Sequence, residues 1–476
     1  MKNHERLTPS RRTAFLAVGL LLGATLAIGA ATHGRGPDPN GGSAARRTSS
    51  NGAVSVSARL DRTAVLAGGE GLVRMEIALD AVRQDSAAPH ERSADLVVVL
   101  DRSGSMNGQK IRDAKNAIRQ LIARLGPEDR FALVAFSSRS ETLIPLTSAG
   151  DASSERWRSV VAGIHAGGGT FMAPGLATGL GHLEAGRTPG RSSRAIVISD
   201  GLAAEPPELL RSWAARAVPG EYSVSTVGVG DDFDEQLMSS LADAGTGNYY
   251  FLENADALAE VFAAEFETAR ETVASAVTVT IEPGPGVRVA DAAGYPLERE
   301  AGIVRFRPGT LYAGQKRRVW VSLRVPTTAG SEALIRSLRV DYTDRGEKQR
   351  LSVDDLPPIA CVEDEDRFFA KLDAGAWAES VAVEEYNQLR QSVAGLVKAG
   401  RKTRALGHIA DFKRRNTAIN EVMASPAVAS QLRAADALED EVAESFRGPD
   451  AERKQIRLGK TLHAQGTLER RKGSRK

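Results

Sequence analysis

The sequence predicts an α/β protein with a doubly wound, mostly parallel sheet flanked by helices, joined to an antiparallel β-sandwich module and a helical C-terminal region. Three observations predict this fold class. Between residues 95 and 270, short apolar runs alternate with helical patterns. On both sides of this segment, apolar residues recur at every second position. After residue 361, apolar residues recur at helical spacing. A length of 476 residues suits several domains better than a single core.

The N-terminal segment, residues 1–33, is predicted to be a signal peptide or a single-pass anchor. Arg11 and Arg12 precede an apolar run over residues 14–31, and a Gly-, Pro- and Ser-rich linker over residues 34–52 is expected to be disordered. The run is at the short end for a membrane span, so cleavage and anchoring both stay open. We therefore expect an exported protein in the periplasm or at the cell surface, with residues 14–31 as the candidate inner-membrane anchor.

Charge and cysteine content narrow the function classes. The 62 basic residues are almost matched by 60 acidic ones, and the net charge of +2 gives no reason to expect a nucleic-acid partner. The only cysteine is Cys361, which excludes an intrachain disulfide and a thiolate zinc cluster. Stability is therefore expected to come from core packing.

Alternating hydrophobicity predicts antiparallel strands on both sides of the α/β stretch. Residues 53–93 are expected to form a β-hairpin with one solvent-facing side, and residues 273–360 a β-sandwich module. The apolar side of the hairpin is predicted to carry Val73, Met75, Ile77 and Leu79, with Arg74, Glu76 and Ala78 on the other. Because an isolated hairpin is marginally stable, we expect it to be part of the same sandwich, with the α/β domain inserted between them.

The α/β domain itself is predicted over residues 94–272, because strand and helix patterns alternate there. Strands are expected at Leu96–Leu100, Phe131–Phe136, Thr142–Leu146, Ala195–Ser199, Ser223–Val229 and Tyr249–Leu252. Helices are expected at Gly108–Leu125, Ser154–Gly163, Pro174–Glu184, Pro207–Ala217, Glu235–Ala242 and Ala255–Thr272. The apolar strand that ends at Leu100 is expected to be central and buried on both faces.

Two further segments complete the chain. Residues 361–447 are predicted to form a helical region, because apolar residues such as Trp377, Leu389 and Val393 recur there at helical spacing. Residues 448–476 are polar and basic, and we expect them to form a disordered tail.

A cluster of oxygen-bearing side chains follows the central strand. Asp101, Ser103 and Ser105 come directly after it, and Gly104 allows a tight turn between the two serines. In open α/β sheets ligands bind beyond the carboxyl ends of the strands, which is where this cluster is expected. One carboxylate and two hydroxyls supply half of the octahedral oxygen shell that Mg²⁺ prefers. A helix-capping turn is the alternative for these three residues alone.

Two other loops are predicted to reach the same edge. The glycines of residues 167–169 precede Thr170 in a loop before a helix, and the strand that contains residues 196–198 ends at Ser199 and Asp200. The absent side chains of the glycine run would let the backbone approach and bring the Thr170 hydroxyl to a metal. Three loops are therefore expected to converge on one cation site.

These motifs resemble the metal-ion-dependent adhesion site of von Willebrand factor type A domains: D-x-S-x-S after the first strand, a Thr in a glycine-rich loop, and S-D-G in a third loop. The resemblance covers roughly residues 93–272. It implies a Rossmann-like fold and metal binding by Asp101, Ser103, Ser105, Thr170 and Asp200. The implied cofactor is Mg²⁺, with Mn²⁺ or Ca²⁺ as alternatives, and the implied partner is a protein that presents an Asp or Glu carboxylate.

The expected function is metal-dependent protein binding or adhesion at the cell envelope, without catalysis. Two alternatives stay open, namely a non-catalytic subunit that positions an enzyme or ATPase partner, and a structural envelope scaffold. The sequence has neither G-x-x-x-x-G-K-[ST] nor H-E-x-x-H, so nucleotide hydrolysis and zinc proteolysis have no visible motif. A haloacid-dehalogenase-type phosphatase needs a second acidic residue two positions after its first aspartate, where this chain has Ser103. That reaction therefore lacks its acid/base residue here.

Overall fold

The protein is described from a computed structural model, over residues 46–82, 93–188, 191–230, 233–252, 254–471 and 474–475. The predicted export segment, residues 1–33, lies outside the described residues, as does the candidate anchor at residues 14–31. Within the described residues, no helix combines the length and the apolar character that crossing a membrane requires.

A six-stranded sheet forms the middle layer of the α/β domain, with the order β10-β9-β8-β5-β6-β7. All neighbouring strands are parallel except β7, which runs antiparallel to β6. Its strands are β5 (Ala94–Asp101), β6 (Arg130–Phe136), β7 (Ser140–Ser148), β8 (Ser192–Ser199), β9 (Tyr222–Val229) and β10 (Thr246–Leu252). This is the predicted doubly wound, mostly parallel sheet, and the predicted fold class is confirmed.

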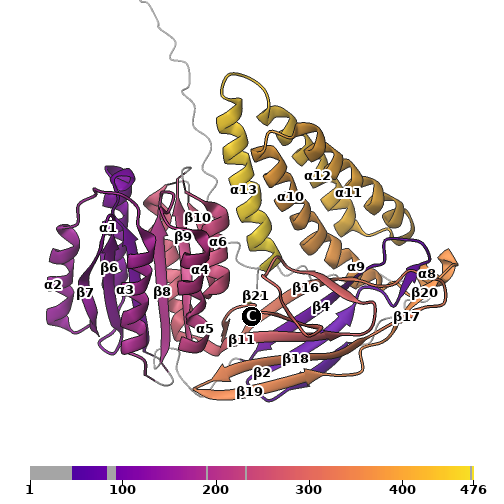
Figure 1. Cartoon of the computed structure of the whole chain (residues 1–476), viewed down its shortest axis with the longest axis horizontal. Helices are drawn as coiled ribbons and strands as arrows, with labels where there is room; N and C mark the ends of the chain where they lie inside the picture. Colours follow the sequence, from indigo (N-terminus) through magenta and orange to yellow (C-terminus); the bar gives the residue numbers. More distant parts are fainter. Residues whose placement is uncertain are drawn as a thin grey trace, which may run out of the picture. The chain divides into compact units, whose positions relative to one another are not determined.

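Helices cover both faces of this sheet, as Figure 1 shows. Alternate residues of β5 separate two cores: Leu96 and Val98 pack with α1, α2 and α7, whereas Val97 and Val99 pack with α3, α4 and α6. The helices are α1 (Gln109–Ile122), α2 (Asp151–Ala162), α3 (Met172–Ala185), α4 (Pro207–Ala215), α5 (Ala217–Gly220), α6 (Glu235–Ala244) and α7 (Leu258–Arg270). Short 3₁₀ turns are η1 (Gly104–Met106) and η2 (Ala255–Ala257).

The position of β5 in the sheet explains where a site can form. The chain goes from β5 to β6 on one side and later pairs β8 on the other. The connection after β5 leads to β6, and the connection after β8 leads to β9 on the other side, so a crevice opens beyond the carboxyl ends of β5 and β8. Asp101, the last residue of β5, lies at that crevice.

Two antiparallel sheets form the β-sandwich around a shared apolar core. One has the order β1-β2-β4-β16-β12 and the other β13-β14-β11-β18-β19. Their strands are β1 (Arg47–Ser50), β2 (Val54–Leu60), β4 (Leu72–Ala81), β11 (Thr272–Pro283), β12 (Arg288–Ala292), β13 (Glu298–Glu300), β14 (Ile303–Phe306), β15 (Leu311–Tyr312), β16 (Gln315–Arg324), β18 (Ile335–Asp344) and β19 (Glu347–Val353). A small third sheet joins β3 (Ala64–Leu66), β17 (Glu332–Ala333) and β20 (Ile359–Val362).

The α/β domain is inserted between strands of this sandwich. β4 precedes the α/β domain, β16 follows it, and the two pair antiparallel along their length from Leu72–Arg324 to Asp80–Lys316. Figure 1 shows the early strands β2 and β4 lying among the later strands of the sandwich. β1 pairs with β2, so the expected disorder of residues 34–52 is wrong for residues 47–50, whose backbone is held as an edge strand.

The hairpin side expected to face solvent is buried instead. Arg74, Glu76 and Ala78 are almost fully buried, because the C-terminal helical region covers this side of β4. The Arg74 guanidinium donates to Glu385 at 2.9 Å and to Ser322 Oγ at 2.7 Å. Apolar and polar residues therefore alternate along β4 because one side packs on the apolar core and the other on a polar interface with the helical region. The prediction of a solvent-facing side is wrong.

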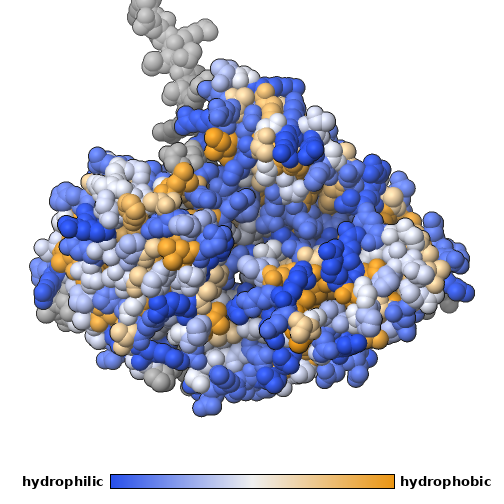
Figure 2. Space-filling model, viewed as in Figure 1, coloured by the Kyte–Doolittle hydropathy of each residue, from blue (hydrophilic) through white to orange (hydrophobic). Residues whose placement is uncertain are grey.

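The helical region contains α8 (Glu365–Ala370), α9 (Ala374–Ser380), the π-helical turn η3 (Val381–Glu385), α10 (Tyr386–Lys398), α11 (Lys402–Met423), α12 (Pro426–Ser445) and α13 (Ala451–Arg471). Apolar side chains at helical spacing, including Trp377 and Val393, form its core. On the face that Figure 2 shows, hydrophilic residues predominate and hydrophobic ones lie in small groups.

The expected disorder of residues 448–476 is wrong for α13 and for the short strand β21 (Ser474–Arg475), which pairs with β16. The buried face of α13 is largely polar, so the amino-acid composition of this segment does not reveal that it packs against the rest of the chain. Lys460 donates to the carbonyl of Phe233 at 2.7 Å and lies 4.2 Å from the centre of its ring. Arg471 pairs with Asp243. These contacts compensate the burial of charge and hold α13 in place.

Candidate metal centre

The first loop of the candidate site follows β5 and turns tightly at Gly104. The Asp101 carboxylate is fully buried, and its Oδ1 accepts the Ser103 backbone N–H at 2.7 Å. The hydroxyls of Ser103 and Ser105 lie 3.0 Å apart. The loop thereby places one carboxylate and two hydroxyls side by side at the carboxyl edge of the sheet.

The third loop brings a second buried carboxylate to the same place. β8 ends at Ser199, and Asp200 follows it with no exposed surface. The Ser105 hydroxyl donates to Asp200 Oδ1 at 2.7 Å, and the Ser199 hydroxyl donates to Asp101 Oδ2 at 2.6 Å. These bonds join residues about 100 positions apart in sequence, because β5 and β8 are parallel neighbours.

The glycine-rich second loop closes over the first. The Gly104 N–H donates to the carbonyl of Gly168 at 3.0 Å. Gly168 has φ +89°, and a Cβ there would lie 2.9 Å from the Ser138 hydroxyl, so only glycine fits without strain. Thr170 is brought next to the third loop, since a Cβ added to Gly201 would lie 3.4 Å from Thr170 Oγ1 and 3.6 Å from Ser105 Oγ.

The structure therefore brings Asp101, Ser103, Ser105, Thr170 and Asp200 to one edge of the sheet. Their role as metal ligands stays a prediction. Ser199, which sequence reasoning mentioned only as part of S-D-G, is a further member of the cluster through its hydrogen bond to Asp101.

Burial dominates the electrostatics of the first carboxylate. It raises the pKa of Asp101, the hydrogen bonds from Ser199 and Ser103 lower it, and the neighbouring Asp200 carboxylate raises it again. Two buried carboxylates close together repel each other, and a cation between them would relieve both effects.

Lys110, which sequence reasoning missed, is the cation that this cluster contains. It belongs to the first turn of α1 and pairs with Asp200 Oδ2, and its side chain is 29% exposed. No motif marks it, because its place depends on how α1 begins after the first loop.

The donor set fits a hard divalent cation. Two carboxylates and three hydroxyls are all oxygen donors of the kind that Mg²⁺, Mn²⁺ and Ca²⁺ prefer, and the Lys110 side chain pairs with one of the carboxylates. Within the described residues there is no cluster of three or more His, Cys, Asp or Glu side chains suited to a metal. The candidate site differs from such a cluster in that hydroxyls supply most of its donors.

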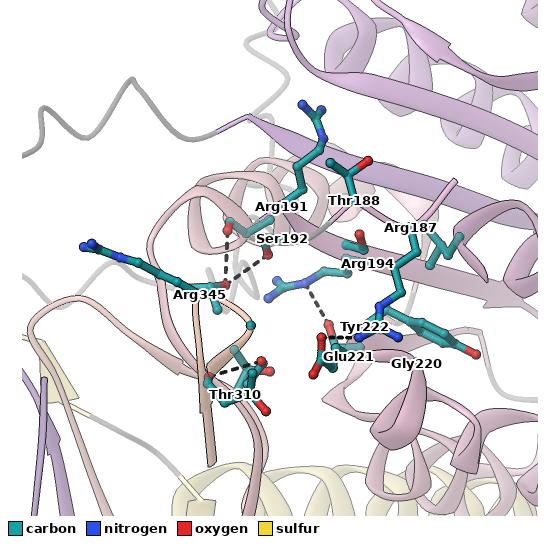
Figure 3. A pocket seen from close by; sticks show the side chains of 18 of the residues that line it. Arg187, Thr188, Arg191, Ser192, Arg194, Gly220, Glu221, Tyr222, Thr310 and Arg345 are labelled. Carbon is teal, nitrogen blue, oxygen red and sulfur yellow. Dashed lines mark hydrogen bonds and ion pairs between the residues drawn. The ribbon is translucent and has the colours of Figure 1, made fainter. Parts of the chain in front are cut away.

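A cavity of about 390 Å³ lies at the opposite edge of the sheet, where β8 and β9 begin beside the sandwich. Figure 3 shows Arg187, Arg191 and Arg194 among its lining residues. Each of these arginines is already paired with a carboxylate: Arg187 with Glu221 at 2.5 Å, Arg191 with Asp95 at 2.9 Å, and Arg194 with Glu265 at 2.6 Å. All three ion pairs lie within the α/β domain, and because each arginine already has a carboxylate partner, this cavity is not a second anion site.

Comparison with known proteins agrees with the fold of the α/β domain. A family model of the von Willebrand factor type A domain matches residues 95–264. A solved structure described as von Willebrand factor type A from Catenulispora acidiphila has a TM-score of 0.58 and 19% sequence identity, covering 78% of this chain and 88% of that one. At this identity the likeness shows the fold alone. Residues 95–264 are therefore a von Willebrand factor type A domain.

Three curated relatives share parts of the chain. An uncharacterized protein of Synechocystis sp. is 23% identical over 299 residues, which are 60% of this chain and 69% of that protein. The E3 ubiquitin-protein ligase WAV3 of Arabidopsis thaliana is 28% identical over 54% of this chain and 34% of its own length. Human inter-alpha-trypsin inhibitor heavy chain H4 is 31% identical over 31% of this chain and 17% of its own. The chain thus spans about a third or less of the latter two.

Proposed function

We propose that this protein binds a protein partner through a divalent cation held by its type A domain. Type A domains generally serve protein–protein interaction or adhesion, and residues 95–264 form one. The observation that carries the metal-dependent part is the meeting of two fully buried carboxylates with the hydroxyls of Ser103 and Ser105 at the crevice beyond β5.

In this proposal Asp101, Ser103, Ser105, Thr170 and Asp200 hold the cation, and Mg²⁺ is the favoured ion, with Mn²⁺ or Ca²⁺ as alternatives. The bound cation supplies a Lewis-acidic position for one further oxygen ligand. Asp101 and Asp200 together neutralise a divalent charge, whereas the hydroxyls are neutral. An Asp or Glu carboxylate of a partner protein is therefore the ligand that the site would favour.

We further propose that the protein acts without catalysis of its own and outside the cytoplasm. The proposed location rests on Arg11, Arg12 and the apolar run over residues 14–31, which are typical of an export signal or anchor.

A second candidate function is a non-catalytic subunit that positions an enzyme. The similarity over 54% of this chain to a protein named as a ubiquitin ligase favours it, because that name describes an enzyme with a similar segment in its chain. Recovery of a hydrolase, ligase or ATPase as the retained partner would support this second function.

The test is retention of proteins from an envelope extract on the immobilised full chain, in Mg²⁺ and in EDTA. We expect at least one protein to be retained in Mg²⁺ only, and to be lost from Asp101→Ala in Mg²⁺. Asp113→Ala is the matched control, since it removes a carboxylate from α1 that lies outside the cluster and pairs with Gln109. The same proteins in every condition would contradict the proposal.

A further inference from the structure

A lysine lies inside the candidate metal centre, although a cation site gains nothing from a second positive charge. Lys110 Nζ pairs with Asp200 Oδ2, while Asp200 Oδ1 accepts the Ser105 hydroxyl at 2.7 Å. Both oxygens of this carboxylate therefore have a partner within the protein. A divalent ion that binds Asp200 has to replace or weaken one of these interactions.

The position of Lys110 is also unfavourable for its own helix. It is the second residue of α1, whose first turn carries no acidic side chain and whose N-cap, Gly108, makes no capping bond. The positive end of a helix dipole disfavours a cation at this position. The lysine is thus held there by Asp200 and not by helix formation.

The backbone at Gly230 lies close to the ammonium group of Lys110. A Cβ added to Gly230, at the end of β9, would lie 3.5 Å from Lys110 Nζ. Gly230 has φ +81°, so the loop passes close to the lysine without a side chain between them. Lys110 is consequently confined next to Asp200 by α1 and by Gly230.

We propose that Lys110 is a built-in competitor of the divalent ion for Asp200. It neutralises this buried carboxylate while the metal is absent, and it repels the metal when the metal binds. The loaded site then carries two carboxylates, one divalent ion and one ammonium group, which gives a net charge of +1. That excess charge favours an anionic partner ligand and makes metal binding weaker without one. This inference rests on the proposed function of the same site.

The experiment is calorimetric titration of the metal-free full chain with MgCl₂, at one ionic strength, for the wild type and Lys110→Met. Removing the nearby positive charge should tighten Mg²⁺ binding by about three- to tenfold. Lys110→Arg keeps the charge and should bind Mg²⁺ as the wild type does.

Lys115→Met is the matched control. Lys115 is on the same helix and its removal changes the net charge equally, but it donates to the carbonyls of Ala162 at 2.6 Å and Ile164 at 3.0 Å, away from both carboxylates. It should leave the Mg²⁺ affinity within about twofold of the wild type, because distant charges are screened.

Unchanged or weaker Mg²⁺ binding by Lys110→Met would overturn the competitor role, and weaker binding would show that Lys110 instead positions Asp200. That result leaves the proposed function standing, provided that the wild type binds Mg²⁺ and Asp101→Ala does not. If neither the wild type nor Lys110→Met binds Mg²⁺, both proposals fail.

Discussion

At the scale of single residues, charged side chains buried at junctions hold this protein together. Arg470 is the clearest case, with a side chain that is 2% exposed near the end of α13. Its Nε donates to Glu384 Oε2 at 2.9 Å and its Nη1 to Gln391 Oε1 at 2.6 Å, and it also pairs with Asp291. Burial raises the pKa of Glu384, and Arg470 opposes this by lowering it. A buried charge of this kind is tolerated only while its partner is present.

Replacing Arg470 by Met should therefore lower the free energy of unfolding by about 3–5 kcal/mol, because the buried Glu384 loses the cation that hydrogen-bonds to both of its oxygens. The measurement is chemical denaturation of both chains at neutral pH. Arg447→Met is the control, since Arg447 and Glu444 form an exposed pair at 3.3 Å whose loss should cost less than about 1 kcal/mol. Equal losses in the two variants would contradict the structural role given to Arg470.

Residue-scale features of the candidate site were only partly accessible from sequence. Asp101 and Asp200 were predicted to meet because the carboxyl ends of parallel strands share an edge, and Thr170 was predicted to join them because its loop is rich in glycine. The hydrogen bond from Ser199 to Asp101 depends in addition on the register of β5 with β8. The contact of Lys110 with Asp200 depends on the start of α1, which no spacing rule gives.

At the scale of elements, close packing of α3 on β5 supports the first loop of the site. A Cβ on Gly179 would overlap with Cγ2 of Val99, in the strand that ends at Asp101. Gly181, two residues later in α3, has no atom within 4 Å of the same position. The two glycines thus differ in packing while sharing one helix.

Gly179→Ala should destabilise the protein by about 1–3 kcal/mol, because the added methyl group overpacks the core. Gly181→Ala should leave stability unchanged or raise it by up to about 1 kcal/mol, through the higher helix propensity of alanine. Urea unfolding of the two variants and the wild type measures both effects. A similar change in both would mean that α3 does not pack on Val99 as described.

Elements with ordinary hydrophobic patterns were predicted well, and α13 was not. Its buried residues include Lys460, Thr467 and Arg470, so the side facing the rest of the chain is largely polar. Composition alone favours disorder for such a segment. Its order comes from ion pairs and hydrogen bonds with distant residues, which a local pattern cannot reveal. The buried polar side of β4 escaped prediction for the same reason.

At the scale of the whole molecule, the chain combines an inserted domain with a helix that contacts all three regions. Alternating patterns predicted the α/β domain, the β-sandwich and the helical region, and each class of structure is present. From α13, Lys460 contacts Phe233 of the type A domain, and Arg470 contacts both Asp291 of the sandwich and Glu384 of the helical region. These connections follow from tertiary packing and had no signal in the sequence.

The central claim is that the crevice beyond β5 holds a divalent cation. The most direct measurement is anomalous X-ray diffraction from crystals of the full chain grown with Mn²⁺. We predict an anomalous peak about 2.0–2.6 Å from the Ser103 and Ser105 hydroxyl oxygens, and no such peak in crystals of Asp101→Ala. Manganese found only elsewhere, or at the same place in both proteins, would contradict it.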